Sequence, residues 1–217
     1  MWVLVGSGLG LGCGLFLRWR LNRLDYRLEE IKDADGLAET DRATPGKRWW
    51  IPVILAVAWA GLGWGVVTEM GTGQWVRLVG WLAFSVIGMW LSVIDLDVQR
   101  LPNSAQLILA VITISCGIIS YWDQPDRMLL GLIVGLGCGL GFWLIHLISR
   151  GGLGLGDVKL IMTCGWWLGL ASLTAVYAAI GTGCVFGLAY SWLTKTRQFA
   201  FGPWLIAGTL IAGLVVT

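Results

Sequence analysis

Charge is scarce in this sequence. Only 13% of its 217 residues are charged, whereas 57% are apolar or aromatic, and soluble domains usually carry about a quarter charged residues. Histidine occurs once and no C-x-x-C pair is present, which excludes a zinc signature and a metal site built from several histidines. The composition also excludes an intrinsically disordered chain and a disulfide-stapled module. A helical membrane protein remains, because long apolar runs replace the alternation typical of a barrel.

Uncharged runs define the expected spans. Each is long enough to cross, or nearly cross, a hydrocarbon core that takes roughly 20 helical residues. The runs are Met1–Leu17, Trp49–Thr68, Leu78–Ile94, Leu101–Trp122, Met128–Ser149, Leu160–Thr194 and Gln198–Thr217. The sixth would make one helix of about 52 Å, against a core of about 30 Å, so we predict two helices with a tight turn near Gly169–Ser172. The expected fold is all-α, with about eight transmembrane helices.

The basic residues predict the orientation of these helices. If the odd-numbered loops are cytoplasmic, they hold 13 of the 15 Lys and Arg residues, and the even loops hold only Arg77 and Arg127. Positive charge is retained on the cytoplasmic side, so both termini are expected outside the cell membrane. The acidic and basic residues of the even loops are interpreted as solvated charges.

The chain divides into two expected parts. Residues 1–48 comprise a first transmembrane helix and a short cytoplasmic loop, Arg18–Arg48, and residues 49–217 form a membrane-embedded domain. The first run has no basic segment before it and no signal-peptidase-like cleavage site, so we expect it to be retained. The loop mixes both signs of charge and resembles a solvated linker, which argues against nucleic-acid binding. Gly131, Gly135 and Gly139 recur at four-residue spacing, a pattern of helix–helix packing.

Three acidic residues lie where the predicted spans meet the cytoplasmic face. Asp95 and Asp97 follow the third span, and Asp157 opens the sixth after a glycine-rich turn. A carboxylate at helix depth costs roughly 2.5–3.5 kcal/mol on insertion scales, which favours a functional role. The alternative is structural, with each acid acting as an interfacial cap or as the partner of Arg100 or Lys159.

Two carboxylates that meet in a partly dry site are suited to one chemistry. They do not both ionise cheaply, so one holds its proton while the other acts as a base, and the pair titrates as a unit. The ionised carboxylate takes a proton from water, and the protonated one polarises the scissile carbonyl and then protonates the leaving amine. This is the logic of an aspartic protease, which requires no cofactor, no metal and no nucleophilic side chain.

Three segments carry a resemblance to a known family. Gly154-Leu155-Gly156-Asp157-Val158-Lys159-Leu160 matches a G-x-G-D-x-K-L segment, and Ile94-Asp95 followed by Leu101-Pro102-Asn103 resembles an I-D…L-P-D motif. Phe201-Gly202-Pro203 is similar to an F-G-P segment before the last span. In this order, they resemble the type IV prepilin peptidases, the bacterial members of the GxGD membrane aspartic proteases. The resemblance covers about Trp49 to Thr217.

The resemblance implies roles for individual residues. Asp95 and Asp157 would be the catalytic pair, with Asp97 as the rival to Asp95, since positions two apart on a helix point about 200° away from each other. Gly154 and Gly156 would allow close approach of the backbone. Two further supporting residues are expected: Lys159 would support the site or anchor the helix at the interface, and Pro102 would end an extended turn and begin the next helix.

The resemblance also implies a substrate and a location. Such enzymes cleave the basic leader of type IV prepilins or pseudopilins at the cytoplasmic face of the inner membrane, and a substrate with a hydrophobic helix would dock between spans in contact with lipid. Many also N-methylate the product and carry a cysteine-rich cytoplasmic domain. The loop Arg18–Arg48 holds no cysteine, so N-methyltransferase activity and structural zinc are not expected here.

Two alternatives are weighed against this interpretation. Presenilin-like proteases pair their GxGD aspartate with a Y-D helix and a P-A-L segment, and this chain has Ile94-Asp95 and no P-A-L. A transporter or assembly factor would use the acids as a proton relay. Against a relay, the acids lie at span ends and the loops show no inverted repeat. Dependence of prepilin cleavage on both aspartates distinguishes the protease from the relay.

Overall fold

A computed structural model describes residues 2–23, 48–67, 72–98, 101–149, 153–194 and 201–216. These segments form eight α-helices and contain no strand, which confirms the predicted all-α fold. The helices are α1 (Trp2–Arg23), α3 (Trp50–Val67), α4 (Thr72–Val98), α5 (Asn103–Ser120), α6 (Pro125–Ile148), α7 (Leu155–Gly169), α8 (Leu173–Thr194) and α9 (Gly202–Val216).

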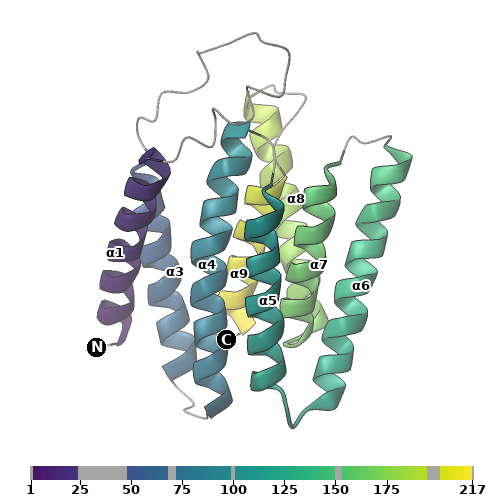
Figure 1. Ribbon diagram of the computed structural model, residues 1–217, viewed down its shortest axis with the longest axis horizontal. Helices are drawn as coiled ribbons and strands as arrows, with labels where there is room; N and C mark the ends of the chain where they lie inside the picture. The colour runs from purple at the N-terminus through teal and green to yellow at the C-terminus, as the bar shows by residue number, and fades with distance from the viewer. Residues whose placement is uncertain are drawn as a thin grey trace.

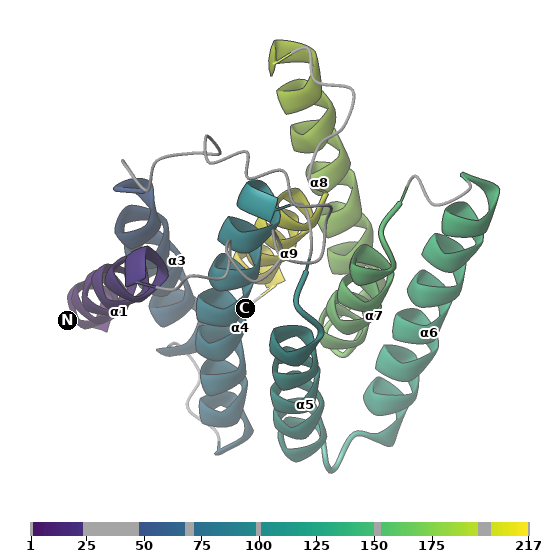
Figure 2. The same ribbon diagram turned by 45° about the horizontal axis from the view of Figure 1, so that its top comes forward.

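Successive helices run in opposite directions through the bundle, and the two marked chain ends lie at the same end of it (Figure 1). Figure 2 shows α1 and α6 at opposite edges, with α4 and α9 between them. The long apolar run from Leu160 is divided as predicted: α7 ends at Gly169 and α8 begins at Leu173. One end of the bundle therefore gathers the end of α4 and the beginnings of α5, α7 and α9.

Four of the helices are long and apolar enough to cross a membrane. Their candidate spans are Gly73–Asp97, Asn103–Ser120, Pro125–Ile148 and Leu173–Leu193. Two shorter apolar stretches, Trp50–Gly61 and Gly202–Leu214, lie in α3 and α9. The prediction of a multi-pass helical protein is confirmed, and the predicted number of eight spans is approximate.

Several helix boundaries differ from those expected from the uncharged runs. Helix α1 continues to Arg23, so the polar loop predicted to begin at Arg18 begins later. Helix α4 begins at Thr72, ahead of the expected Leu78, and it includes Arg77. The reason is that Arg77 has partners: its Nη1 donates to Tyr121 Oη at 3.1 Å, and its guanidinium lies 5.4 Å from the centre of that ring. Residues 24–47 of the predicted loop lie outside the described segments.

Arg127 is exposed, as expected of a solvated charge, but it also contacts the protein. It lies in the first turn of α6, and its Nη1 donates to the carbonyl oxygens of Leu170, at 3.4 Å, and Ala171. These carbonyls follow the last turn of α7, where helix carbonyls have no partner within the helix. Arg127 therefore caps α7 and fixes the tight turn into α8.

The core consists of two clusters that meet on α4. The larger one joins α4, α5, α7, α8 and α9 around Phe84, Leu91, Leu109, Leu160, Ile161 and Leu205. The smaller one joins α1 and α3 to the other face of α4, through Leu17, Leu21, Ile51, Leu55, Met89 and Val93. Helix α4 is thus buried on two sides, which fixes the position of its last turn.

Helices α6 and α7 pack through the predicted glycine stripe. Gly131, Gly135 and Gly139 are the buried residues of α6. A Cβ placed on Gly135 would lie 3.0 Å from both the Met162 carbonyl oxygen and the Trp166 backbone nitrogen. The missing side chains therefore allow the two backbones to approach closely, as small residues do between membrane helices.

Candidate active site

Asp95 lies in the last turn of α4, and its side chain is buried, with 3% exposed. The backbone N–H of Gly202, the first residue of α9, donates to its carboxylate. A Cβ on Gly202 would lie only 2.7 Å from Asp95 Oδ2. Glycine at this position therefore allows the beginning of α9 to approach the carboxylate, and the positive end of that helix favours a negative charge there.

Asp157 lies in the first turn of α7 and is also buried, with 9% exposed. Gly154 precedes the helix as its N-cap residue, and its backbone N–H donates to the Asp157 carboxylate. The Asp157 backbone N–H in turn donates to the Gly154 carbonyl at 3.1 Å. The turn around Gly154 therefore holds Asp157 through both its backbone and its side chain.

The two carboxylates approach each other closely enough for the charge of Asp157 to act on Asp95. Each also presents a buried oxygen without a hydrogen-bond partner among the described residues, Asp95 Oδ2 and Asp157 Oδ1. Buried polar atoms are normally satisfied, and exceptions often mark a catalytic role. The pair joins two segments 62 positions apart in the sequence, one at the end of α4 and one at the beginning of α7.

Asp97 does not belong to this pair. Its carboxylate forms an ion pair with the Arg48 guanidinium, just before α3. Because side chains two positions apart on a helix point about 200° away from each other, α4 directs Asp95 and Asp97 to different neighbours. The structure therefore brings together Asp95 and Asp157 of the three predicted acids, and gives Asp97 a basic partner instead.

Pro102 and Gly156 connect the two motifs. Pro102 has extended backbone (φ −63°, ψ 126°) and is the N-cap residue of α5, so it begins that helix as expected from the sequence. Its carbonyl accepts the backbone N–H of Gln106 at 3.2 Å. The Gln106 side chain then reaches α7, where Nε2 donates to the Gly156 carbonyl at 2.9 Å. A Cβ on Gly156 would lie 3.0 Å from Leu101 Cβ, which is closer than ordinary contact.

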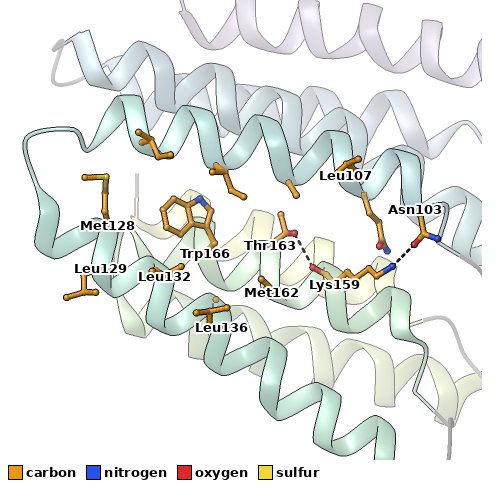
Figure 3. Close-up of a pocket in the computed structure, with 15 residues that line it drawn as sticks. Asn103, Leu107, Met128, Leu129, Leu132, Leu136, Lys159, Met162, Thr163 and Trp166 are labelled. Atoms are coloured by element: carbon orange, nitrogen blue, oxygen red, sulfur yellow. Dashed lines mark hydrogen bonds between the residues drawn. The ribbon is translucent and has the colours of Figure 1, made fainter.

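Lys159 is directed toward the beginning of α5. Its Nζ donates to Asn103 Oδ1 at 2.7 Å and joins the beginnings of α5 and α7 (Figure 3). Both residues lie at one end of a groove of about 850 Å³. A supporting role for Lys159 stays a prediction, and its position makes contact with a ligand in the groove more direct than contact with the carboxylates.

The groove lies between α5 and α6 with α7 as its floor (Figure 3). Leu107 on α5 faces Leu132 and Leu136 on α6, and Met162 and Trp166 come from α7. Apart from Thr163, whose hydroxyl donates to the Lys159 carbonyl, its lining is apolar except at the end near Asn103, Gln106 and Lys159. A ligand for this groove needs an apolar body and a polar end close to the turn that carries Asp157.

Three contacts were not predicted from the sequence. Gln106 was not singled out, although a polar residue one turn after Pro102 in an apolar run was a visible signal. Gly202 was seen as part of a motif but was given no role. The sequence indicates Arg48 only as one of the basic loop residues that set topology, and nothing in its local sequence indicates Asp97 as its partner.

Known proteins match this sequence. Residues 82–192 match the type IV leader peptidase family. A "Type 4 prepilin-like proteins leader peptide-processing enzyme" of an enterotoxigenic Escherichia coli is 36% identical over 145 residues, which cover 59% of this chain and 50% of that protein. A "Prepilin leader peptidase/N-methyltransferase" of Neisseria gonorrhoeae is 30% identical over 158 residues, covering 70% of this chain and 54% of that protein.

A further relative matches over nearly the whole chain. The "Prepilin leader peptidase/N-methyltransferase" of Escherichia coli K-12 is 29% identical over 215 residues, which cover 91% of each chain. The other two relatives are matched over only about half of their own length. No solved structure matches this chain with significance.

Proposed function

The chain belongs to the type IV leader peptidase family, and from this premise we propose that it is a membrane aspartic endopeptidase. Its substrates are type IV prepilin-like or pseudopilin-like proteins, whose basic leader it removes. The observation that supports the proposal most directly is the meeting of two buried carboxylates, Asp95 and Asp157, at one end of the helical bundle.

The proposed reaction uses the pair as acid and base. Two carboxylates this close do not both ionise cheaply, so one holds a proton and the other does not. The ionised carboxylate removes a proton from water as the water oxygen attacks the scissile carbonyl, whose oxygen receives a hydrogen bond from the protonated one. The tetrahedral intermediate then collapses, the C–N bond breaks, and a proton passes to the leaving amine. The buried oxygens Asp95 Oδ2 and Asp157 Oδ1 have no partner within the described segments, so they are open to these contacts.

The apolar groove supports a substrate with a hydrophobic helix. That helix would lie between α5 and α6, and its polar end would reach the turn carrying Asp157, near Lys159 and Asn103. In the proposed orientation this end of the bundle is the cytoplasmic face of the inner membrane, where a basic leader remains in water. We do not extend the proposal to N-methyl transfer, because the segment Arg18–Arg48 is short and has no cysteine.

The test is a cleavage assay with the purified chain in lipid. The wild type is mixed with a full-length prepilin and with a prepilin altered at its leader junction, and the products are identified by mass spectrometry. We expect a single cut at the junction, with oxygen from labelled water in the new carboxylate of the released leader, and we expect Asp157→Asn to abolish the cut.

Two outcomes would contradict the proposal. A folded wild-type chain that leaves every prepilin intact would exclude this substrate class and would favour the proton-relay alternative. Cleavage that survives in Asp157→Asn at the wild-type rate would exclude the two-aspartate mechanism while leaving the substrate class in place.

A further inference from the structure

We propose that Gln106 is a positioning residue for Asp157, a role that rests on the proposed peptidase function. Gln106 lies on α5 and is buried, with 5% exposed. Its amide nitrogen donates to the Gly156 carbonyl across 50 positions of sequence, at 2.9 Å. Because a carbonyl oxygen only accepts hydrogen bonds, the donor at this contact has to be the NH₂ group of the amide.

The contact acts on the peptide unit that carries Asp157. That unit consists of the Gly156 carbonyl and the Asp157 N–H, and each is held by a different partner. The carbonyl accepts from Gln106 Nε2, and the N–H donates to the Gly154 carbonyl at 3.1 Å. A rotation of this peptide plane would swing the Asp157 side chain away from Asp95, and the two hydrogen bonds oppose such a rotation.

Because residue 156 is a glycine, the turn before Asp157 needs a restraint from another part of the chain. Glycine allows many backbone conformations, so Gly156 does not by itself hold the turn before Asp157. The space a side chain would take is filled instead: a Cβ on Gly156 would lie 3.0 Å from Leu101 Cβ and 3.3 Å from Gln106 Nε2. Gln106 therefore occupies the site that the missing side chain leaves, and it adds a hydrogen bond that no apolar residue would supply.

The amide oxygen of Gln106 indicates that packing alone does not explain why a glutamine occupies this position. Gln106 Oε1 is buried and has no hydrogen-bond partner among the described residues. An unpaired buried acceptor is unfavourable for folding, and an apolar side chain of similar size would avoid the cost. Gln106 is in turn held by Pro102, whose carbonyl accepts its backbone N–H. The Pro102 turn of the first motif thereby positions the aspartate of the second.

The test compares Gln106→Leu with a matched control on the same helix face. Thr113 lies two turns further along α5, is buried, and donates from its hydroxyl only within its own helix, to the Leu109 and Ala110 carbonyls. Steady-state cleavage of a prepilin is measured for the wild type, Gln106→Leu and Thr113→Val. We expect Gln106→Leu to lower kcat by about tenfold or more with KM changed less than about threefold, because the aspartate is displaced while the apolar walls of the groove, such as Leu132 and Trp166, are unchanged. Thr113→Val should leave both values near those of the wild type.

Gln106→Glu supplies a readout that a purely structural role would not give. An ionised Glu does not donate to the Gly156 carbonyl, whereas a protonated one does. We expect its deficit in kcat relative to the wild type to shrink as the pH falls. A deficit independent of pH, wild-type kcat in Gln106→Leu, or an equal loss in Thr113→Val would each overturn the inference.

The same assay separates this inference from the function on which it rests. Asp157→Asn is measured beside the Gln106 variants. If the wild type cleaves, Asp157→Asn does not, and Gln106→Leu matches the wild type, then the inference alone is wrong. A wild-type chain that does not cleave overturns both.

Discussion

Asp95 and Asp97 lie only two positions apart but have different neighbours in this protein. Asp95 approaches Asp157 and the first amide of α9, whereas Asp97 pairs with Arg48. The backbone of α4 explains this difference, because it turns about 200° between the two positions. A carboxylate held by a guanidinium is poorly placed to take a proton from water, so the ion pair itself argues that Asp97 is structural.

A structural role for Asp97 predicts that its replacement lowers the stability of the protein but leaves prepilin cleavage intact. We expect Asp97→Asn to lower the free energy of unfolding by about 2 kcal/mol, because it removes a charge-assisted hydrogen bond from a mostly buried pair. Chemical denaturation in detergent, with Arg48→Met and the double variant completing a cycle, measures the coupling between the two residues. Cleavage by the folded fraction should remain close to wild type. Additive effects of the two single changes would show that the ion pair contributes nothing.

The sequence singles out the two acids that the structure brings together, but it does not indicate the contacts around them. Motifs and positions at span ends single out Asp95, Asp157 and Pro102. An acidic residue beside an apolar run can be recognised from the sequence alone. The bond from Gln106 to Gly156 and the pairing of Arg48 with Asp97 join residues about 50 positions apart. Such contacts depend on how the helices pack, and local spacing carries no information about that.

At the level of the helices, the positions of charged residues did not predict the helix boundaries correctly. Uncharged runs placed the beginning of the third span at Leu78, but α4 begins at Thr72 because Arg77 binds Tyr121. Arg127 is exposed, as expected, but the sequence did not indicate that it also caps the end of α7. The division of the long apolar run was predicted correctly, because length alone excludes a single span there.

The glycine stripe of α6 leads to a prediction about packing. In Gly135→Ala the new Cβ would lie 3.0 Å from backbone atoms of α7 that have no way to rotate aside. We expect α6 and α7 to separate slightly and the protein to lose about 1–3 kcal/mol of stability. The thermal midpoint in detergent measures the change.

Gly137 provides the control for this substitution. It lies on the same helix, but a Cβ there meets nothing within 4 Å. Gly137→Ala should be neutral or slightly stabilising, because alanine favours the helix more than glycine does. Equal midpoints for the two variants would contradict the close approach of α6 and α7.

For the whole molecule, the arrangement of helices predicts an orientation in the membrane. The end that carries Asp95 and Asp157 is proposed to face the cytoplasm, which places the turn between α5 and α6 outside. In a cysteine-free background, we expect Asp123→Cys to react with a membrane-impermeant maleimide in intact cells. Ser149→Cys, at the other end of α6, should react only after permeabilisation. The reverse pattern would invert the proposed topology and separate the site from a cytoplasmic leader.

The most direct measurement compares three variants in one prepilin cleavage assay: Asp95→Asn, Asp97→Asn and Asp157→Asn, each shown to be folded. The proposed pair predicts that the first and third lose cleavage by at least about a thousandfold, because removing either member of a catalytic unit disables it. Asp97→Asn should remain active. Loss of cleavage in Asp97→Asn together with an active Asp95→Asn would contradict the account, and would move the site to the opposite face of α4.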